Sequence, residues 1–130
     1  IPLIGPDART LIDPIPEDLL RDELCAVVRI WGGDLVAAPQ LMAARWYQAF
    51  VVVTWCRILM TLETGRIHSK LASARWAQKN LDPRWENLIE HALNERQLPW
   101  AIKVSENASL KNLQTTDAFT HYVLERLGKE

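Results

Sequence analysis

AFVVVTWCRILMTLETGRIHSK, residues 49–70, decides the fold of this chain. Between residues 49 and 62 the apolar run is interrupted only by Thr54, Arg57 and Thr61. A helix that is apolar on nearly all sides is surrounded by other helices, so we expect residues 39–63 to form the centre of a helical bundle. Gly65 predicts the end of this helix, because glycine readily adopts the left-handed conformation found there.

Amphipathic segments on both sides of this helix predict four further helices, at residues 17–31, 70–80, 83–96 and 109–127. Gly32-Gly33 is expected to end the first of them, and Ser69 is expected to cap the start of the segment at 70–80. Residues 100–108 are a loop or a short turn in this interpretation. No strand is expected. Short connections between amphipathic helices favour antiparallel neighbours, so the sequence predicts an all-α, up-and-down bundle of about five helices.

The first 16 residues differ from the rest of the chain, since they hold the prolines at positions 2, 6, 14 and 16. This composition predicts an extended connector at 1–16, followed by one helical domain at 17–130. The formal net charge of −1 does not favour a nucleic-acid or membrane-surface partner. Cys25 and Cys56 lie in apolar helical segments without metal or redox spacing, which predicts buried thiols in a reducing, cytoplasmic compartment.

Two cations near the central helix point to a candidate site. Arg57 lies within the apolar helix, where a charge is costly unless it has a partner. Lys70 stands at the start of the next predicted helix, just past the turn at Gly65. Two cations that face the same cleft predict an anionic ligand, most simply a chain of phosphates.

The run VVTWCRILMTLETGRIHSKLASARWAQKN, residues 52–80, resembles the C-terminal helical domain of aminoglycoside adenylyltransferases of the streptomycin/spectinomycin type. The resemblance rests on a T-G-[KR]-I-x-x-K element that ends at Lys70, on Arg57 in the preceding helix, and on the A-x-W-A segment at 74–77. It extends over nearly the whole chain and is weaker at 33–44 and 97–112.

The resemblance implies a function in two parts. Family members join this helical domain to an N-terminal nucleotidyltransferase domain with a G-S motif and paired aspartates, and the whole enzyme transfers AMP from Mg-ATP to a hydroxyl of an aminoglycoside-like molecule. This chain has no G-S…D-x-D arrangement, so we expect no catalytic residue, no metal ligand and no activity in the chain alone. The resemblance assigns Arg57 and Lys70 to the ATP phosphates, and Trp31 and Asp34 to the acceptor. It also implies a role in antibiotic resistance.

Two positions depart from the family pattern. Tyr47 stands roughly where the family can place an acid for a cationic drug. Arg96 stands near the position of a family tyrosine that can stack on adenine. The acceptor and the recognition of the base are therefore open at this point.

Two other functions remain possible from the sequence. The first is a stand-alone helical ribonuclease or toxin of the HEPN type, which needs an arginine and a histidine close together on one helix. Arg84 and His91 match that requirement loosely. The second is a bundle that binds a small molecule or a partner without chemistry.

Overall fold

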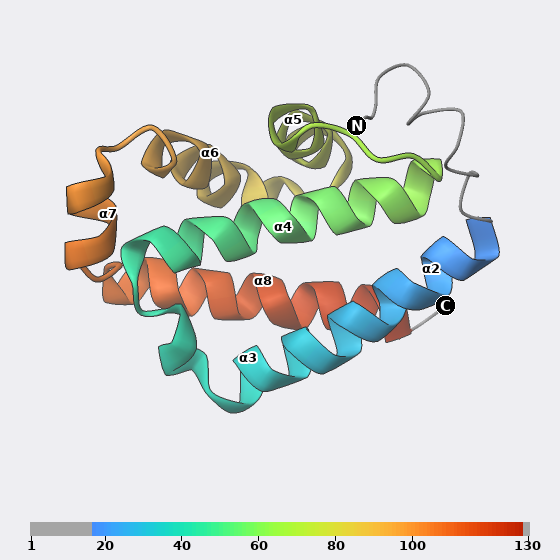
Figure 1. The fold of residues 1–130 in the computed structure, drawn as a ribbon, viewed down its shortest axis with the longest axis horizontal. Helices are drawn as coiled ribbons and strands as arrows, with labels where there is room; N and C mark the ends of the chain where they lie inside the picture. Colours follow the sequence, from blue (N-terminus) through green and yellow to red (C-terminus); the bar gives the residue numbers. More distant parts are fainter. Residues whose placement is uncertain (1–16, 129–130) are drawn as a thin grey trace, which may run out of the picture.

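The computed structural model describes residues 17–128, and every element in this range is helical (Figure 1). The all-α prediction is therefore confirmed. The predicted connector at 1–16 lies outside the described residues. The elements follow in the order α2 Glu17–Val27, η1 Val28–Gly32, α3 Gly33–Ala37, η2 Pro39–Met42, α4 Arg45–Thr64, α5 Lys70–Asn80, η3 Pro83–Trp85, α6 Glu86–Glu95, α7 Trp100–Ser105 and α8 Leu110–Gly128.

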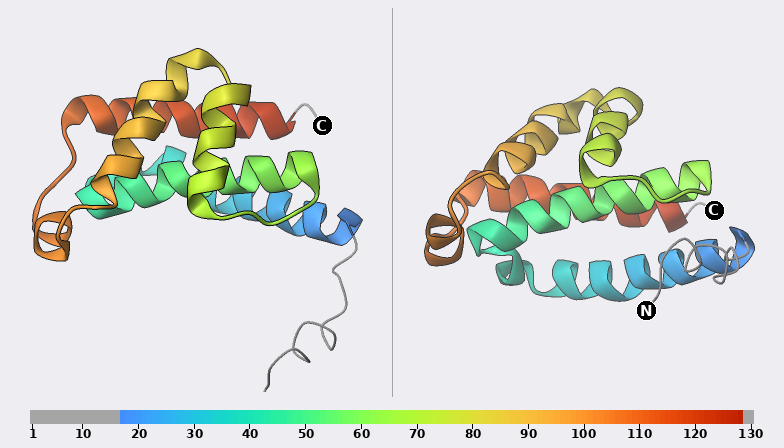
Figure 2. Two further views of the ribbon diagram at one scale, coloured as in Figure 1. Left: turned by 90° about the horizontal axis from the view of Figure 1, so that it is seen from above. Right: turned by 45° about the horizontal axis from the view of Figure 1, so that its top comes forward.

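Helix α4 is the centre of the bundle, as its apolar sequence predicts. It contacts α2, α5, α6, α7 and α8, and its fully buried side chains include Val51, Val52 and Trp55. Figure 2 shows α5 and α6 lying side by side across α4 and α8. The segment from α2 to α3 packs along α8 on the other side of the molecule. One long helix therefore carries side chains to every layer of the domain.

The turn between α4 and α5 forms as the local sequence predicts. Gly65 has a φ of 75° and its N–H donates to the carbonyl of Thr61, which ends α4. The Ser69 hydroxyl accepts a hydrogen bond of 3.0 Å from the N–H of Ala72, which caps α5 at its first turn. The structure confirms the bounds of 70–80 predicted for this helix. Lys70 is consequently held at the start of α5, close in sequence to the end of α4.

The first helix does not end at Gly32-Gly33, so that prediction is wrong. The chain continues through the π-helical turn η1 and then through α3 to Ala37. Gly32 is needed for packing instead, because a Cβ built there would lie 2.9 Å from Cδ2 of Leu124 on α8. The central helix also begins later than predicted, at Arg45, since a 3₁₀ turn occupies residues 39–42.

Three smaller findings complete the fold. Residues 100–105, left as a loop or short turn by the sequence, form the short helix α7. Cys56 is buried as expected and burial raises the pKa of its thiol to about 12, whereas Cys25 is only half-buried. Within residues 17–128 no helix combines the length and the apolar character needed to cross a membrane.

Candidate functional site

Arg57 lies in a hollow between α2 and α4. The hollow has a volume of about 200 Å³, and its other lining residues are Leu20, Leu24, Thr54, Ile58, Thr61 and Ile67. Arg57 is half-buried, and it has no ion-pair or hydrogen-bond partner among residues 17–128. A guanidinium in apolar surroundings without a partner is unfavourable, so this position favours an anion supplied from elsewhere.

Lys70 lines a larger cleft on the same side of α4. This cleft has a volume of about 300 Å³ and is bordered by side chains from α4, the start of α5, the end of α6 and α7, namely Trp46, Ala49, Phe50, Val53, Thr54, Lys70, Arg96, Trp100 and Lys103. Thr54 belongs to both hollows. The structure therefore places Arg57 and Lys70 in two adjoining hollows along one helix, whereas the sequence analysis expected them to face a single cleft.

The charge in these two hollows is of one sign. Their lining includes the cations Arg57, Lys70, Arg96 and Lys103, and it includes no aspartate or glutamate. Lys70 sits in the first turn of α5, where the helix dipole disfavours a cation. An anion bound beside it would offset that cost and would also meet free backbone N–H groups. The arrangement is suited to binding a multiply charged anion.

Trp31 and Asp34 lie apart from these cations. Trp31 is half-buried and its indole N–H donates a 2.9 Å hydrogen bond to the hydroxyl of Tyr47. Its ring lies 4.6 Å from that of Trp55 and 6.2 Å from that of Phe50, measured between centroids. Since Phe50 borders the Lys70 cleft, Trp31 supports the rim of that cleft. The acceptor role of Trp31 stays a prediction.

Asp34 was expected in a loop, and the structure instead places it in the first turn of α3. This position suits a carboxylate, because the N-terminal end of a helix carries partial positive charge. Its side chain is exposed and forms no ion pair with any residue from 17 to 128. It lines neither hollow. An acceptor role for Asp34 is also still a prediction.

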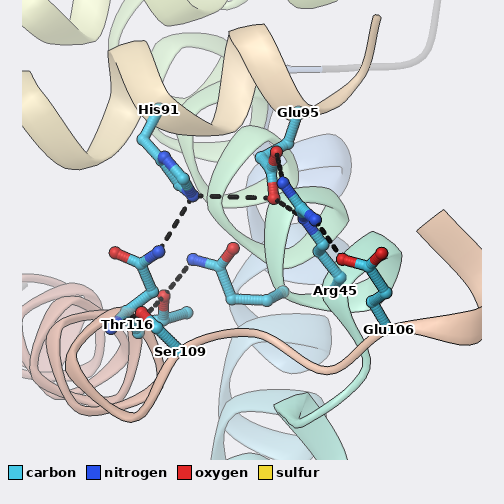
Figure 3. Close-up of polar contacts among 8 residues, drawn as sticks. Arg45, His91, Glu95, Glu106, Ser109 and Thr116 are labelled. Carbon is cyan, nitrogen blue, oxygen red and sulfur yellow. Dashed lines mark hydrogen bonds and ion pairs between the residues drawn. The ribbon is translucent and has the colours of Figure 1, made fainter. Parts of the chain in front are cut away.

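A polar network braces the end of α4 that borders the cleft (Figure 3). The guanidinium of Arg45 contacts both oxygens of Glu95 on α6, including an Nη2–Oε2 distance of 2.9 Å, and it also binds Glu106, which follows α7. Hydrogen bonding to Glu95 raises the pKa of Arg45 above its usual value. Glu95 is buried. The network joins α4, α6 and the segment after α7.

The same network involves His91, one of the two residues that the ribonuclease alternative requires. The Nε2 atom of His91 lies 2.9 Å from the side-chain nitrogen of Asn112 and 3.7 Å from Glu95. Arg84, the other residue, lies on η3 with its guanidinium 4.4 Å from the ring centroid of Trp85. The structure gives each residue its own structural partners and records no contact between them.

Sequence reasoning missed the contribution of α7 to the cleft. Trp100 is 64% exposed and lies 6.3 Å from Trp46 between ring centroids. The ammonium of Lys103 lies 5.6 Å from the centroid of the Trp100 ring. The spacing of Trp100 and Lys103 places them on one face of a helix, so a helical reading of 100–105 would have found the pair.

Comparison with known proteins identifies the family of this chain. Residues 10–126 match the family model described as "Aminoglycoside adenylyltransferase, C-terminal domain". Proteins named aminoglycoside (3'') (9) adenylyltransferase from Klebsiella pneumoniae and Shigella flexneri are each 30% identical to the chain over 129 residues, and one from Escherichia coli is 29% identical. Each match covers 99% of the chain and 44% of the relative, so the chain spans less than half the length of these proteins. No solved structure matches the chain significantly.

Proposed function

The chain belongs to the family of aminoglycoside adenylyltransferase C-terminal domains, and from this premise we propose that it is the part of such an enzyme that binds ATP and the acceptor. The observation that carries the proposal is the placement of Arg57 and Lys70 in adjoining hollows that contain no acidic side chain. Both cations lack an ion-pair partner among residues 17–128. The phosphates of a nucleotide would provide that partner for both.

The proposed reaction is the transfer of AMP from Mg-ATP to a hydroxyl. The acceptor oxygen forms a bond to the α-phosphorus, the bond to the bridging oxygen breaks, and pyrophosphate leaves with that oxygen. Arg57 and Lys70 would hold the phosphate oxygens and balance the charge that accumulates on the leaving group. The chain's contribution is thus positioning and charge stabilisation rather than proton transfer.

The magnesium ion and the acid–base chemistry would be supplied outside the described residues. In the range 17–128 no three aspartate, glutamate, histidine or cysteine side chains converge as metal ligands. The relatives are more than twice as long as this chain, which leaves room in them for a separate nucleotidyltransferase domain. We propose such a domain as the partner of this one, with the shared nucleotide bound between them.

The proposal predicts a specific loss of nucleotide affinity. Each charged hydrogen bond contributes about 1.5–3 kcal/mol, and 1.4 kcal/mol is tenfold in affinity. Arg57→Ala and Lys70→Ala should each weaken Mg-ATP binding to the intact protein by roughly tenfold or more, measured by isothermal titration calorimetry. Turnover with spectinomycin or streptomycin as the acceptor should fall in parallel.

The controls are surface cations away from the two hollows. Lys79 lies at the other end of α5, and Arg29 lies on η1. Both side chains are exposed, and the control variants are Lys79→Ala and Arg29→Ala. Neither should change ATP affinity by more than about twofold, since each removes only a distant, screened charge. If Arg57→Ala and Lys70→Ala bound ATP as tightly as the two controls, Arg57 and Lys70 would not belong to the phosphate site.

A further inference from the structure

A series of aromatic rings runs through Trp31 from the core of the domain to its surface. The indole of Trp31 lies 4.6 Å from the ring of Trp55, which is fully buried, measured between centroids. On its other side lies the ring of Phe50, at 6.2 Å, and this side chain is 44% exposed. Trp31 therefore connects the buried core to an exposed aromatic group, and exposed apolar groups of this size often mark binding surfaces.

The backbone that carries Trp31 has an uncommon conformation. Residues Val28–Gly32 form the π-helical turn η1, and π-helical turns are rare and occur frequently at functional sites. Gly32 packs so closely on α8 that a Cβ there would lie 2.9 Å from Cδ2 of Leu124, and it would lie 3.4 Å from Cη2 of Trp55. The main chain next to Trp31 is therefore fixed by packing, and the orientation of the indole depends on what the ring itself contacts.

We propose that Tyr47 is the positioning residue for Trp31 in the acceptor site. The Tyr47 hydroxyl accepts a 2.9 Å hydrogen bond from the indole N–H, and this is the one hydrogen bond of the Trp31 side chain within residues 17–128. The two rings meet edge to face, at an interplanar angle of 79°. The inference rests on the proposed function, since contact between Trp31 and the acceptor belongs to that proposal.

Tyr47 is itself held in place, so its hydroxyl is preorganised. Its ring stacks on that of Phe50 at 5.9 Å and lies against that of Trp46 at 5.2 Å, measured between centroids. All three side chains belong to the first turns of α4. A hydroxyl fixed in this way also fixes the rotation of the indole, because a rotated indole would leave its N–H without an acceptor.

The hydrogen bond also determines what Trp31 can offer to a ligand. An indole has a single polar hydrogen, and Tyr47 accepts it. The ligand therefore meets the flat apolar ring and no hydrogen-bond donor, so the plane of the ring sets where an acceptor molecule lies. A misplacement of about 1 Å can cost about 10²-fold in rate, which makes the orientation of this ring important for turnover.

The test is a kinetic comparison of the two tyrosines of the chain. Tyr47→Phe removes only the hydroxyl that accepts the Trp31 N–H. Tyr122→Phe is the matched control, because the Tyr122 hydroxyl also accepts a hydrogen bond, at 3.3 Å from Arg126 on α8. In the intact protein, Tyr47→Phe should lower kcat/KM for spectinomycin or streptomycin about tenfold and keep KM for Mg-ATP within about twofold. Tyr122→Phe should leave both within about twofold.

A double-variant cycle separates positioning from direct contact. Trp31→Phe should lower kcat/KM for the acceptor at least as much as Tyr47→Phe does. If Tyr47 acts through Trp31, adding Tyr47→Phe to Trp31→Phe should cause no further loss beyond about twofold. A further loss of about tenfold in the double variant would mean that Tyr47 acts on the acceptor independently, and its positioning role would be wrong.

A second readout follows the indole N–H directly by nuclear magnetic resonance. The Nε1–H signal of Trp31, identified by its absence in Trp31→Phe, should shift in Tyr47→Phe and should exchange faster with solvent. Tyr122→Phe should leave this signal unchanged. An unshifted signal in Tyr47→Phe would show that the hydrogen bond does not hold the indole, and the proposal would be overturned.

The outcomes separate this inference from the proposed function. If Trp31→Phe lowers kcat/KM for the acceptor and Tyr47→Phe does not, the positioning role is wrong while the acceptor role of Trp31 stands. If Trp31→Phe changes nothing, both of these roles fail, and the phosphate site of Arg57 and Lys70 is unaffected. If Tyr47→Phe raises KM for Mg-ATP as much as it lowers kcat/KM for the acceptor, the hydroxyl supports the whole fold and the positioning role is wrong. If the unmodified protein modifies neither drug, both proposals fail.

Discussion

Replacing Arg45 by methionine should destabilise the domain strongly. The Arg45 side chain is 27% exposed, whereas the side chain of Glu95 beside it is only 7% exposed. In Arg45→Met the Glu95 carboxylate would keep only the imidazole of His91, at 3.7 Å, as an ion-pair candidate among the described residues. The variant therefore leaves an ionised group buried without a hydrogen-bonded partner.

The expected cost follows from this geometry. Breaking a buried ion pair by removing one partner costs about 3–5 kcal/mol. Water can reach the partly exposed guanidinium position, so we expect a cost just below that range, about 2–3 kcal/mol. For a domain of this size each kcal/mol lowers Tm by roughly 4 °C. Arg45→Met should accordingly melt about 10 °C below the unmodified chain.

Glu106 provides a matched comparison within the same network. Its side chain is 53% exposed, and exposed ion pairs contribute only about 0–1 kcal/mol. Glu106→Gln should therefore lower the free energy of unfolding by less than about 1 kcal/mol. The double variant Arg45→Met/Glu95→Leu removes both members of the buried pair and should recover much of the loss, because no unpaired charge is left inside.

The assay is urea and thermal unfolding at pH 7, followed by circular dichroism, on the four chains in parallel. If the burial of Glu95 governs this network, Arg45→Met will be clearly less stable than Glu106→Gln. The double variant will also be more stable than Arg45→Met. Equal stability of the two single variants would show that burial of Glu95 does not govern this network.

The remaining predictions concern Gly33, Gly32 and Cys56. Gly33→Ala should stabilise the domain by about 0.5–1 kcal/mol, because the position is helical with no atom within 4 Å of the added Cβ. Gly32→Ala should lower the free energy of unfolding by about 1–3 kcal/mol, because the added Cβ would press on Leu124. If urea unfolding changed this free energy in the same direction for Gly33→Ala and Gly32→Ala, the packing around Gly32 would be contradicted. The Cys56 thiol, with its pKa raised to about 12 from 9.0, stays protonated in the folded chain while the unfolded thiol ionises. The stability difference between the unmodified chain and Cys56→Ala should be constant below about pH 8.5 and should fall by about 1.4 kcal/mol per pH unit from pH 9 upward; a flat difference up to pH 10.5 would show that the thiol is not shielded.

The elements that the sequence predicted correctly are those set by neighbouring residues. The Thr64-Gly65 end of α4 and the Ser69 cap of α5 depend on one glycine conformation and one side-chain hydrogen bond. They place Lys70 one short turn after a helix whose apolar sequence already required a central position. The position of Lys70 at the start of α5 was therefore predictable from a few local rules.

Long-range packing decided what the sequence did not reveal. Gly32-Gly33 has the composition of a helix end, yet the chain stays helical through it. Gly32 instead leaves room for the close approach of Leu124 on α8. Residues 100–105 are too short to form a helix from their own propensity. They do so because the Arg45 network and Lys103 hold them against α4 and α6.

By itself the sequence determined the helical class, the central helix, the cap at Ser69 and the position of Lys70 at the start of α5. Each of these depends on periodicity or on contacts between residues only a few positions apart. Only the tertiary structure decided that Trp46, Arg96 and Trp100 share one cleft with Lys70. These residues come from separate elements, and their meeting depends on how α4, α6 and α7 pack, which no local pattern in the chain encodes.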